Sequence, residues 1–376
     1  MRKDWETKIL DQVCLIKTGK KDVNQGNPNG KYPFFTCARE YTFSDTYSFD
    51  SEAILIAGNG EVGICHYYNG KFEAYQRTYV LSDFIADIDV SYLYYFVEGK
   101  LRDEFRDRRL GNAMPYIRVG MLKDIAVPVP SFTEQKRIVG ILDEKFKAIE
   151  ELKKVTEAQV QDAKELFESR LNIIFGMSEE NILPLSDVCK ITSSKRVYKA
   201  DYVKSGVPFY RTKEIKELAH NKQPTTELFI KRDSFDEITS KFGKPEAGDL
   251  MLTAIGTIGE IYIVEDKDEF YFKDGNILWL KNIKGVTVGY LRYALNFFVK
   301  EIQSLAVGSA YKALTIEKLN NHKIPVPKKE IQNDTVKELD ELSIKTQELM
   351  EVFQNKIINL EELKKSYLEQ AFAGKL

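Results

Sequence analysis

The glycines that follow an early apolar run are the first candidates for chemistry. Gly58, Gly60 and Gly63 spell G-x-G-x-x-G directly after AILIA. In a strand–turn–helix setting, that spacing cradles the pyrophosphate of a dinucleotide. The segment that follows, ICHYYNG, lacks a helical pattern, and no acidic residue stands where a ribose would need one. We therefore predict a tight turn between two strands.

Other side chains that could do chemistry are few and scattered. The chain holds three histidines and four cysteines, at His66, His220, His322, Cys14, Cys37, Cys65 and Cys189. No C-x-x-C pair and no zinc ligand set is present, so we expect reduced thiols and no structural metal. The 57 acidic residues form no pair that recurs in both halves outside the helices described below. A nucleophile elbow, a phosphate-binding loop and a DPPY-type methyltransferase motif are also missing, so no enzyme active site is visible.

An internal duplication organises the whole chain. A shift of 197 residues places IAVPVP (125–130) on HKIPVP (322–327), and residues 135–175 on 332–372 with 13 of 41 positions identical. LDQVC (10–14) matches LSDVC (185–189) at a shift of 175, as YPFF matches VPFY. Gly60 and Gly63 match Gly256 and Gly259, with Ala254 in place of Gly58, at a shift of 196. The second copy thus carries about 21 extra residues before Asp249.

Each copy ends in a predicted long helix that begins after Pro130 or Pro327. A helix of about 40 residues is about 60 Å long. A 3-4 spacing gives each helix an apolar seam, and the first is more polar in its distal half, at Thr156, Gln159 and Arg170. The seam positions are Leu142, Lys145, Ile149, Leu152, Thr156, Gln159, Ala163, Leu166 and Arg170, and Leu339, Leu342, Thr346, Leu349, Phe353, Lys356, Leu360, Leu363 and Tyr367. Such helices need a partner, and we favour pairing with each other over packing on their own domains.

The fronts of the two copies read as mixed, strand-rich domains. Short apolar runs predict strands over 52–58, 249–256 and 260–265. Helical spacing predicts helices over 90–105 and 287–302, and turn residues predict loops over 17–30 and 220–226. The fold class is therefore α+β, with two tandem mixed α/β domains, each followed by a long helix.

Composition excludes several classes of protein. The 376 residues are 43% hydrophobic and 30% charged, as in a folded protein of two or three domains. No apolar run is long enough to span a membrane, and MRKDWETKIL is unlike a signal peptide, so we expect a cytoplasmic protein. The net charge of −2 divides into −1, −1, +2 and −2 over 1–131, 132–177, 178–327 and 328–376. No part is a basic block, which argues against an indiscriminate nucleic-acid coat protein.

The chain therefore contains one arrangement twice: a divergent front, a G-x-A step, a PVP-type segment, a glutamine and a long helix. This arrangement resembles the specificity subunit of type I restriction–modification systems. The resemblance is carried by Gly111-Asn112-Ala113, Val127–Pro130 and Glu134-Gln135, and by Gly308-Ser309-Ala310, Ile324–Pro327 and Gln332. The chain departs from the family at Met114 and Tyr311, where glutamine is frequent, and Ile331 stands where the first copy has Glu134.

The resemblance implies a non-catalytic subunit that reads a bipartite, asymmetric site in double-stranded DNA. It implies target-recognition domains at 1–131 and 178–327, and spacer helices at 132–177 and 328–376 that pair antiparallel with pseudo-twofold symmetry. Two methyltransferase subunits and restriction/translocase subunits would be the partners. S-adenosylmethionine, ATP and Mg would belong to those partners, so this chain itself would hold no cofactor.

Under this resemblance, cations would bind phosphates and forked or amide side chains would read base edges. The strongest cluster brackets the G-x-A loop, and further residues follow strand ends. In the first copy the candidates are Lys17, Lys20, Lys21, Arg39, Asn59, Arg77, Arg106, Arg108, Arg109, Asn112, Tyr116 and Arg118. In the second copy they are Lys195, Arg196, Arg211, Lys213, Lys273, Asn276, Ser309, Tyr311 and Lys312.

Two other functions remain open at this point. The chain could be the recognition subunit of a type IIG-like system, which is the same DNA-reading class with a fused methyltransferase–nuclease. Alternatively, it could be a coiled-coil scaffold that binds only proteins. A scaffold would show no salt-sensitive, sequence-dependent binding to DNA.

Overall fold

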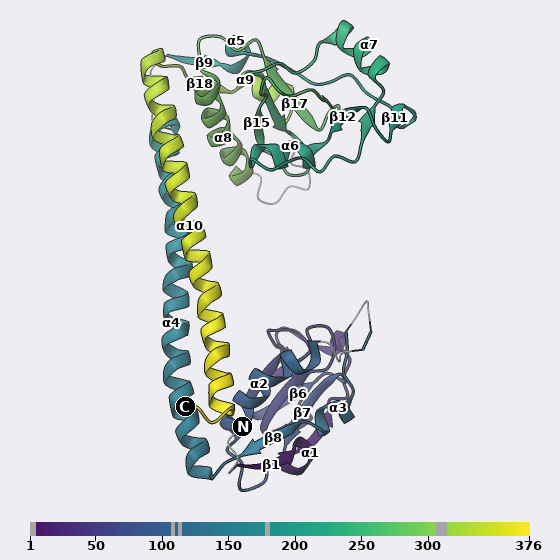
Figure 1. The fold of residues 1–376 in the computed structure, drawn as a ribbon, viewed down its shortest axis with the longest axis vertical. Coiled ribbons are helices and arrows are strands. Elements are labelled where there is room, and N and C mark those ends of the chain that lie inside the picture. Colours follow the sequence, from purple (N-terminus) through teal and green to yellow (C-terminus); the bar gives the residue numbers. More distant parts are fainter. Residues whose placement is uncertain (1–4, 107–109, 112–114, 177–180, 306–313) are drawn as a thin grey trace. The chain divides into compact units, whose positions relative to one another are not determined.

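The computed structural model describes residues 5–106, 110–111, 115–176, 181–305 and 314–376. It divides into two compact units, Met1–Ala158 with Phe353–Leu376, and Gln159–Val352. Each unit contains one front domain and a part of each long helix (Figure 1). In the part of the chain that the structure describes, no helix is long and apolar enough to cross a membrane.

The domain of the first unit is built on a six-stranded sheet of order β2-β7-β5-β6-β3-β4. A separate pair joins β1 to β8, which carries the PVP-type segment. The elements are β1 (Glu6–Ile9), α1 (Leu10–Val13), β2 (Leu15–Thr18), a 3-10 turn (Val23–Gln25), β3 (Tyr32–Phe35), β4 (Thr42–Ser44), β5 (Phe49–Ala57), β6 (Cys65–Ala74), β7 (Thr78–Ser82), α2 (Val90–Arg106), α3 (Val119–Lys123) and β8 (Ala126–Val129).

Alternation along β5 explains how this domain forms its core. Successive side chains of a strand point to opposite faces. Ile54 and Ile56 pack with Leu93 and Val97 of α2, whereas Leu55 joins a second cluster on the other face. The strands predicted at 52–58 and the helix predicted at 90–105 are thus confirmed.

The second unit repeats this plan with additions. Its strands form three sheets, of orders β10-β17-β14-β15, β11-β13-β12-β16 and β18-β9. The elements are β9 (Ile182–Pro184), α5 (Leu185–Val188), β10 (Lys190–Thr192), a 3-10 turn (Lys199–Asp201), β11 (Tyr202–Val203), β12 (Val207–Tyr210), α6 (Thr212–Ala219), β13 (Phe229–Ile230), α7 (Arg232–Phe242), β14 (Leu250–Thr253), β15 (Ile261–Ile263), β16 (Tyr271–Phe272), β17 (Ile277–Lys281), α8 (Val288–Leu305), α9 (Ile316–Asn321) and β18 (Lys323–Pro325).

The extra residues of the second copy form helices α6 and α7. Leu250 and Leu252 of β14 pack with Leu291 of α8, as the corresponding strand does in the first unit. On the other face of β14, Met251 packs with Ile215 of α6. The insertion therefore adds a helix against the second face of this sheet.

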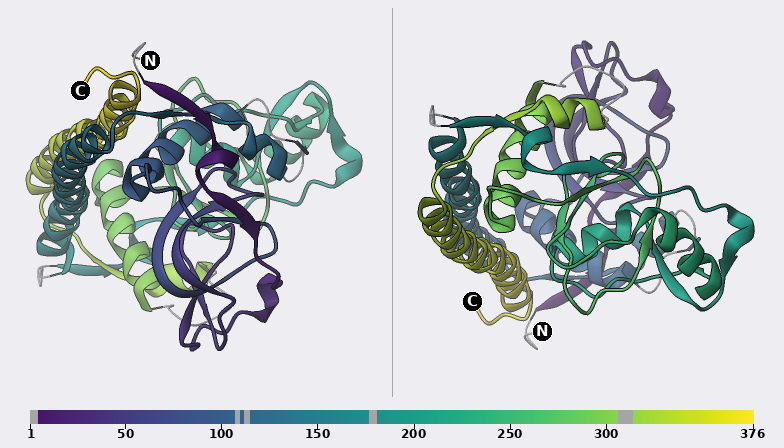
Figure 2. Two further views of the ribbon diagram at one scale, coloured as in Figure 1. Left: turned by 90° about the horizontal axis from the view of Figure 1, so that it is seen from below. Right: turned by 90° about the horizontal axis from the view of Figure 1, so that it is seen from above.

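The two long helices are α4 (Phe132–Leu171), which continues as a π-helical turn at Asn172–Gly176, and α10 (Lys329–Phe372). Within the first unit, Ile138 and Leu142 of α4 share a cluster with Leu368 and Ala371 of α10. Trp5 and Leu376 flank that cluster, so the end of α10 lies beside the start of the chain (Figure 2).

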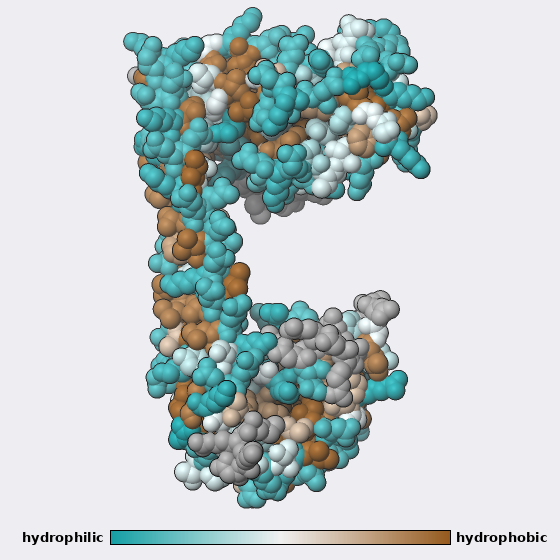
Figure 3. Space-filling model, viewed as in Figure 1, coloured by the Kyte–Doolittle hydropathy of each residue, from teal (hydrophilic) through white to brown (hydrophobic). Residues whose placement is uncertain are grey.

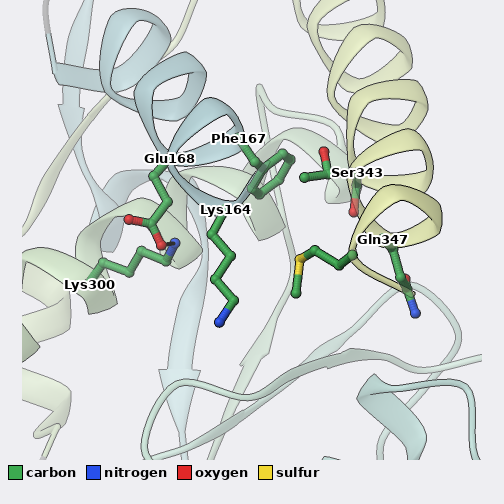
Figure 4. Close-up of a pocket in the computed structure, with 8 residues that line it drawn as sticks. Lys164, Phe167, Glu168, Lys300, Ser343 and Gln347 are labelled. Carbon is green, nitrogen blue, oxygen red and sulfur yellow. Dashed lines mark hydrogen bonds and ion pairs between the residues drawn. The ribbon is translucent and has the colours of Figure 1, made fainter. Parts of the chain in front are cut away.

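The helix segments pair antiparallel within each unit. In the first unit, Lys364 of α10 lies 4.9 Å above the ring of Phe146 of α4. Farther along α4, Lys153 forms an ion pair with Glu361 of α10. In the second unit, Arg170 pairs with Glu338 at 2.5 Å. Phe167 and Ser343 line one hollow there (Figure 4). In both units, residue numbers that rise along α4 are therefore paired with residue numbers that fall along α10.

The predicted seam is half right. Leu142, Ile149, Thr156 and Ala163, with Leu339, Thr346 and Leu360, are buried as expected. The alternate predicted leucines Leu152, Leu166, Leu349 and Leu363 are exposed instead. Their places at the interface are taken one residue later, by Lys153, Phe167, Met350 and Lys364, and Phe146 likewise replaces the predicted Lys145. A helix has 3.6 residues per turn, so a seam can step by three then four residues, or by four then three, from the same buried positions. The leucines favoured the first order, and the structure has the second.

Candidate nucleic-acid interface

The glycine turn of the first unit lies beside the segment that precedes α3. Gly60 and Gly63 have positive φ values of 66° and 89°, which glycine adopts without strain, and they turn β5 back into β6. Ile117 N donates to Gly58 O at 2.9 Å, and Asn59 bridges to Tyr116. The predicted tight turn is confirmed, and it contacts Tyr116 and Ile117, which follow the G-x-A step in the sequence.

The turn between β6 and β7 contacts both the glycine turn and the segment that holds Lys20 and Lys21. Gly58 N donates to Arg77 O at 3.0 Å, and a Cβ on Gly58 would lie 2.4 Å from that oxygen. Gln76 N donates to Lys21 O at 2.9 Å. Candidates from distant parts of the sequence therefore lie together at one end of the sheet: Lys20, Lys21, Asn59, Arg77 and Tyr116.

The cations of this first cluster differ in what they already bind. Lys21 Nζ donates to Ser44 and Thr46 and lies near the buried Glu73, so it points into the domain. Arg39 pairs with Glu61 of the glycine turn at 2.9 Å, although its side chain is largely exposed. Lys17, Lys20, Arg77 and Arg118 are exposed, and none of them forms an ion pair with another described residue.

The second unit builds the same end of the sheet with the same backbone contacts. Leu314 N donates to Ala254 O at 3.2 Å, and Ala254 N donates to Asn276 O at 2.8 Å. These bonds are the counterparts of those that Ile117 and Gly58 make. Lys273 N donates to Tyr210 O at 2.9 Å, so the loop before β17 lies beside the end of β12.

Further candidates of the second unit border this loop. Lys195 N donates to the hydroxyl of Tyr271 at 2.9 Å, and its ammonium lies 5.3 Å above the ring of Phe242. Arg196 pairs with Asp274 at 2.9 Å, and Lys273 approaches the same carboxylate at 3.6 Å. The structure therefore brings Lys195, Arg196, Lys273 and Asn276 together.

Arg211 and Lys213 lie at the start of the inserted helix α6. Arg211 forms ion pairs with Glu214 at 2.9 Å and Glu227 at 3.6 Å, and Lys213 is exposed. Glu214 is fully buried, so part of the role of Arg211 is to neutralise it.

Several candidates cannot be placed. Arg108, Arg109, Asn112, Ser309, Tyr311 and Lys312 lie outside the described residues, and for Arg106 only the helical backbone is described. In the sequence they precede Tyr116 and Leu314, and the structure places those two residues beside the two clusters.

Sequence reasoning missed two further polar residues of the second unit. Lys216 and His220 of the inserted segment both approach Glu260, at 3.7 Å and 2.9 Å, directly after the turn equivalent to the glycine turn. Their position inside the insertion was the available signal, because a segment present in only one copy can distinguish what the two copies read.

Burial shifts the pKa values of two cysteines and one histidine toward their neutral forms. Burial raises the pKa of Cys14 and of Cys189 to about 12, so both remain protonated thiols. Burial lowers the pKa of His322 to about 4, and its ring stacks on Phe298. All four cysteines are free. Among the described residues, no group of histidines, cysteines and acids could hold a metal ion.

A family model, described as the type I restriction modification DNA specificity domain, matches this chain twice, at residues 2–161 and 177–359. The chain belongs to the type I restriction–modification specificity subunit family. Each match spans one front domain and most of the long helix that follows it, so the family pattern is repeated as the sequence predicted.

Curated relatives agree with this membership, and solved structures share the fold. The chain is 27% identical to the EcoDI specificity subunit of Escherichia coli, over 99% of this chain and 89% of that protein. It is 25% identical to a specificity subunit of Haemophilus influenzae, over 92% and 89%. A chain from a study of complex assembly in a type I system matches with a TM-score of 0.77 at 17% identity, covering 99% and 98%. The HsdS subunit of Thermoanaerobacter tengcongensis matches with a TM-score of 0.57, covering 100% and 98%.

Proposed function

We propose that this specificity subunit reads a bipartite, asymmetric DNA site, with one half-site bound by each recognition domain. The observation that carries the proposal is the repeated sheet end. The two domains share one set of backbone contacts there but present different side chains, such as Arg77 in one and Asn276 in the other. A common frame with different polar groups suits two different half-sites.

The clusters described above are the proposed DNA-contacting surfaces, together with the loop residues outside the described structure. Arginine and asparagine give bidentate contacts to guanine and adenine in the major groove, and lysine binds phosphate. Exposed Arg77 and Arg118 suit direct contact with DNA. Arg39 and Arg196 each pair with a carboxylate in the free protein. When DNA binds, each guanidinium would either leave that carboxylate for a DNA group or contact both.

The low net charge has a place in this proposal. A net charge of −2 gives the chain little general attraction for phosphates. The candidate cations that the structure describes gather at two sheet ends, which favours selective reading over coating. The methyltransferase subunits would supply much of the hold on the duplex.

Exposed apolar residues on the spacer helices are the proposed docking places for those subunits. Leu152 and Val155 of α4 are 47% and 56% exposed, and their repeat equivalents Leu349 and Val352 of α10 are 45% and 60% exposed. Residues three apart lie on one face of a helix. Figure 3 shows brown apolar surface along the helices among polar residues. The same pair of residues, present twice, suits two copies of one partner.

Methylation chemistry and restriction would belong to the partners, with S-adenosylmethionine, ATP and Mg bound there. The decisive experiment is co-expression with the cognate methyltransferase subunit, followed by mapping of methylated adenines. A bipartite motif with a fixed spacer is the expected result. Methylation that follows a single continuous motif, or a complex that never forms, would overturn the proposal.

A further inference from the structure

A buried glutamine fastens each spacer helix to its recognition domain. Gln135 is the fourth residue of α4, and its side chain is fully buried. Its Nε2 donates to Pro130 O at 2.9 Å and to Asp87 O at 2.8 Å, and its Oε1 accepts from Asp89 N at 2.9 Å. One amide therefore joins the PVP-type segment, the loop before α2 and the start of α4.

Gln332 makes the same three hydrogen bonds at the start of α10. Its Nε2 donates to Pro327 O at 2.8 Å and to Gly285 O at 3.0 Å, and its Oε1 accepts from Thr287 N at 2.7 Å. Asp89 and Thr287 are themselves the residues that cap α2 and α8, because each accepts a backbone N–H three residues later. The glutamine thus ties the start of a spacer helix to the start of a domain helix.

A second attachment lies eight residues farther along each spacer helix. The hydroxyl of Tyr95 on α2 donates to Asp143 of α4. The hydroxyl of Tyr293 on α8 donates to Asp340 of α10 at 2.5 Å, and Arg292 adds a bond of 2.8 Å to the same oxygen. Eight helical residues span about 12 Å. Two fixed points at that separation define a direction, whereas one point would permit the helix to swing.

We propose that Gln135 with Asp143, and Gln332 with Asp340, are positioning residues that fix the direction of each spacer helix and so the number of base pairs between the half-sites. This inference rests on the proposed bipartite function. A swing of roughly 3° at the base of a helix about 60 Å long moves its far end by about 3 Å, close to the rise of one base pair. Small changes at the joint are therefore amplified to the scale of the spacer.

The other spacer helix also touches each domain, so loss of one joint relaxes the direction and does not release the domain. Lys364 of α10 pairs with Glu98 of α2 at 3.0 Å. Glu168 of α4 pairs with Lys300 of α8 at 2.6 Å (Figure 4). These pairs remain in a glutamine variant.

The test compares full-length complexes, each co-expressed with the methyltransferase subunit, on DNA whose half-sites are constant and whose spacer is one base pair shorter or longer. In Gln135→Leu and Gln332→Leu, the rate on altered spacers relative to the natural spacer should rise about tenfold, a change of about 1.4 kcal/mol in discrimination. Base preference within each half-site should stay unchanged. Tyr95→Phe and Tyr293→Phe should give the same shift more weakly, and they keep the buried amides intact should the glutamine variants fail to fold.

Gln161→Leu is the matched control, because Gln161 is exposed on α4 and lies outside both joints. It should keep the natural spacer preference. An unchanged spacer preference in all four joint variants, or relaxed base preference in place of relaxed spacing, would overturn the inference. A wild-type complex with no bipartite motif would instead refute the proposed function, so the two failures can be told apart.

Discussion

The ammonium of Lys21 lies 3.4 Å from a carboxylate oxygen of Glu73, and the Glu73 side chain is fully buried in β6. Lys21 Nζ also donates to Ser44 Oγ at 2.8 Å and to Thr46 Oγ1 at 2.6 Å. A buried carboxylate needs a counter-charge, because its desolvation is otherwise uncompensated. Lys21 therefore serves the domain core, even though it lies in the cluster predicted to bind DNA.

Removing this lysine should destabilise the first recognition domain. Lys21→Met leaves the buried Glu73 carboxyl without its counter-charge, and we expect a loss of about 3 kcal/mol. Urea unfolding of the full chain measures the change. Lys20→Met, at the exposed neighbouring position, is the control. The double variant Lys21→Met/Glu73→Gln should recover part of the loss, and an unfolding midpoint equal to wild type in Lys21→Met alone would contradict this role.

Exposed arginines at the first sheet end should affect one half-site only. Arg77→Ala and Arg118→Ala should each reduce methylation about tenfold, the cost of one good contact to a base or phosphate. The double variant Arg109→Ala/Arg118→Ala should abolish site-specific methylation. Reading of the second half-site should be unaffected. Lys100→Ala, which changes an exposed residue of α2, is the control, and wild-type rates in the double variant would refute this placement.

From the sequence, the candidate DNA-contacting surfaces could be predicted only as residues that follow the ends of strands. The repeat identified Gly58, Ala254 and the segments before the spacer helices as equivalent, and the structure places them in equivalent hydrogen bonds. What the sequence could not reveal is which cations are already neutralised. Lys21 and Arg211 look like surface charges in a sequence, yet each faces a fully buried acid, Glu73 or Glu214. Lys21 and Glu73 belong to distant segments, so no local pattern encodes that pair. Arg211 and Glu214 are three residues apart at the start of α6, but the burial of Glu214 depends on tertiary packing that the local sequence does not show.

Acid should destabilise the second domain partly through His322. Burial lowers the pKa of His322 to about 4, whereas an unfolded histidine titrates near 6.5. Between these values the unfolded chain binds a proton that the folded chain does not, so stability falls as the pH drops from about 6.5 to 4.

In His322→Phe, the ring can still stack on Phe298 but cannot titrate. The variant should therefore lose less stability than wild type between pH 7 and pH 5, by about 1 kcal/mol after allowance for partial exposure of the imidazole. Urea unfolding at the two pH values measures the difference. Equal losses in both proteins would show that His322 does not contribute.

The helices were predictable in extent, and their interface only in part. Proline before each helix and the 3-4 apolar spacing along it predicted the extents of α4 and α10 to within a few residues. The interface was ambiguous because Leu152 and Lys153 both satisfy the alternating spacing, and apolar character favoured the leucine. In the structure Lys153 faces α10 and pairs with Glu361, and Leu152 remains exposed. Leucines that repeat at exposed positions are better explained by a partner than by the seam.

That explanation predicts how the complex assembles. Leu152→Glu and Leu349→Glu each place a carboxylate in one of two equivalent apolar surfaces, where contact with a partner would desolvate it. Each single variant should therefore bind one methyltransferase subunit per chain, and the double variant none, as measured by light scattering of the purified complexes. Gln161→Glu adds the same charge on the other flank of α4 and should bind two. If the double variant also bound two subunits, the docking surface would have to lie elsewhere on the chain.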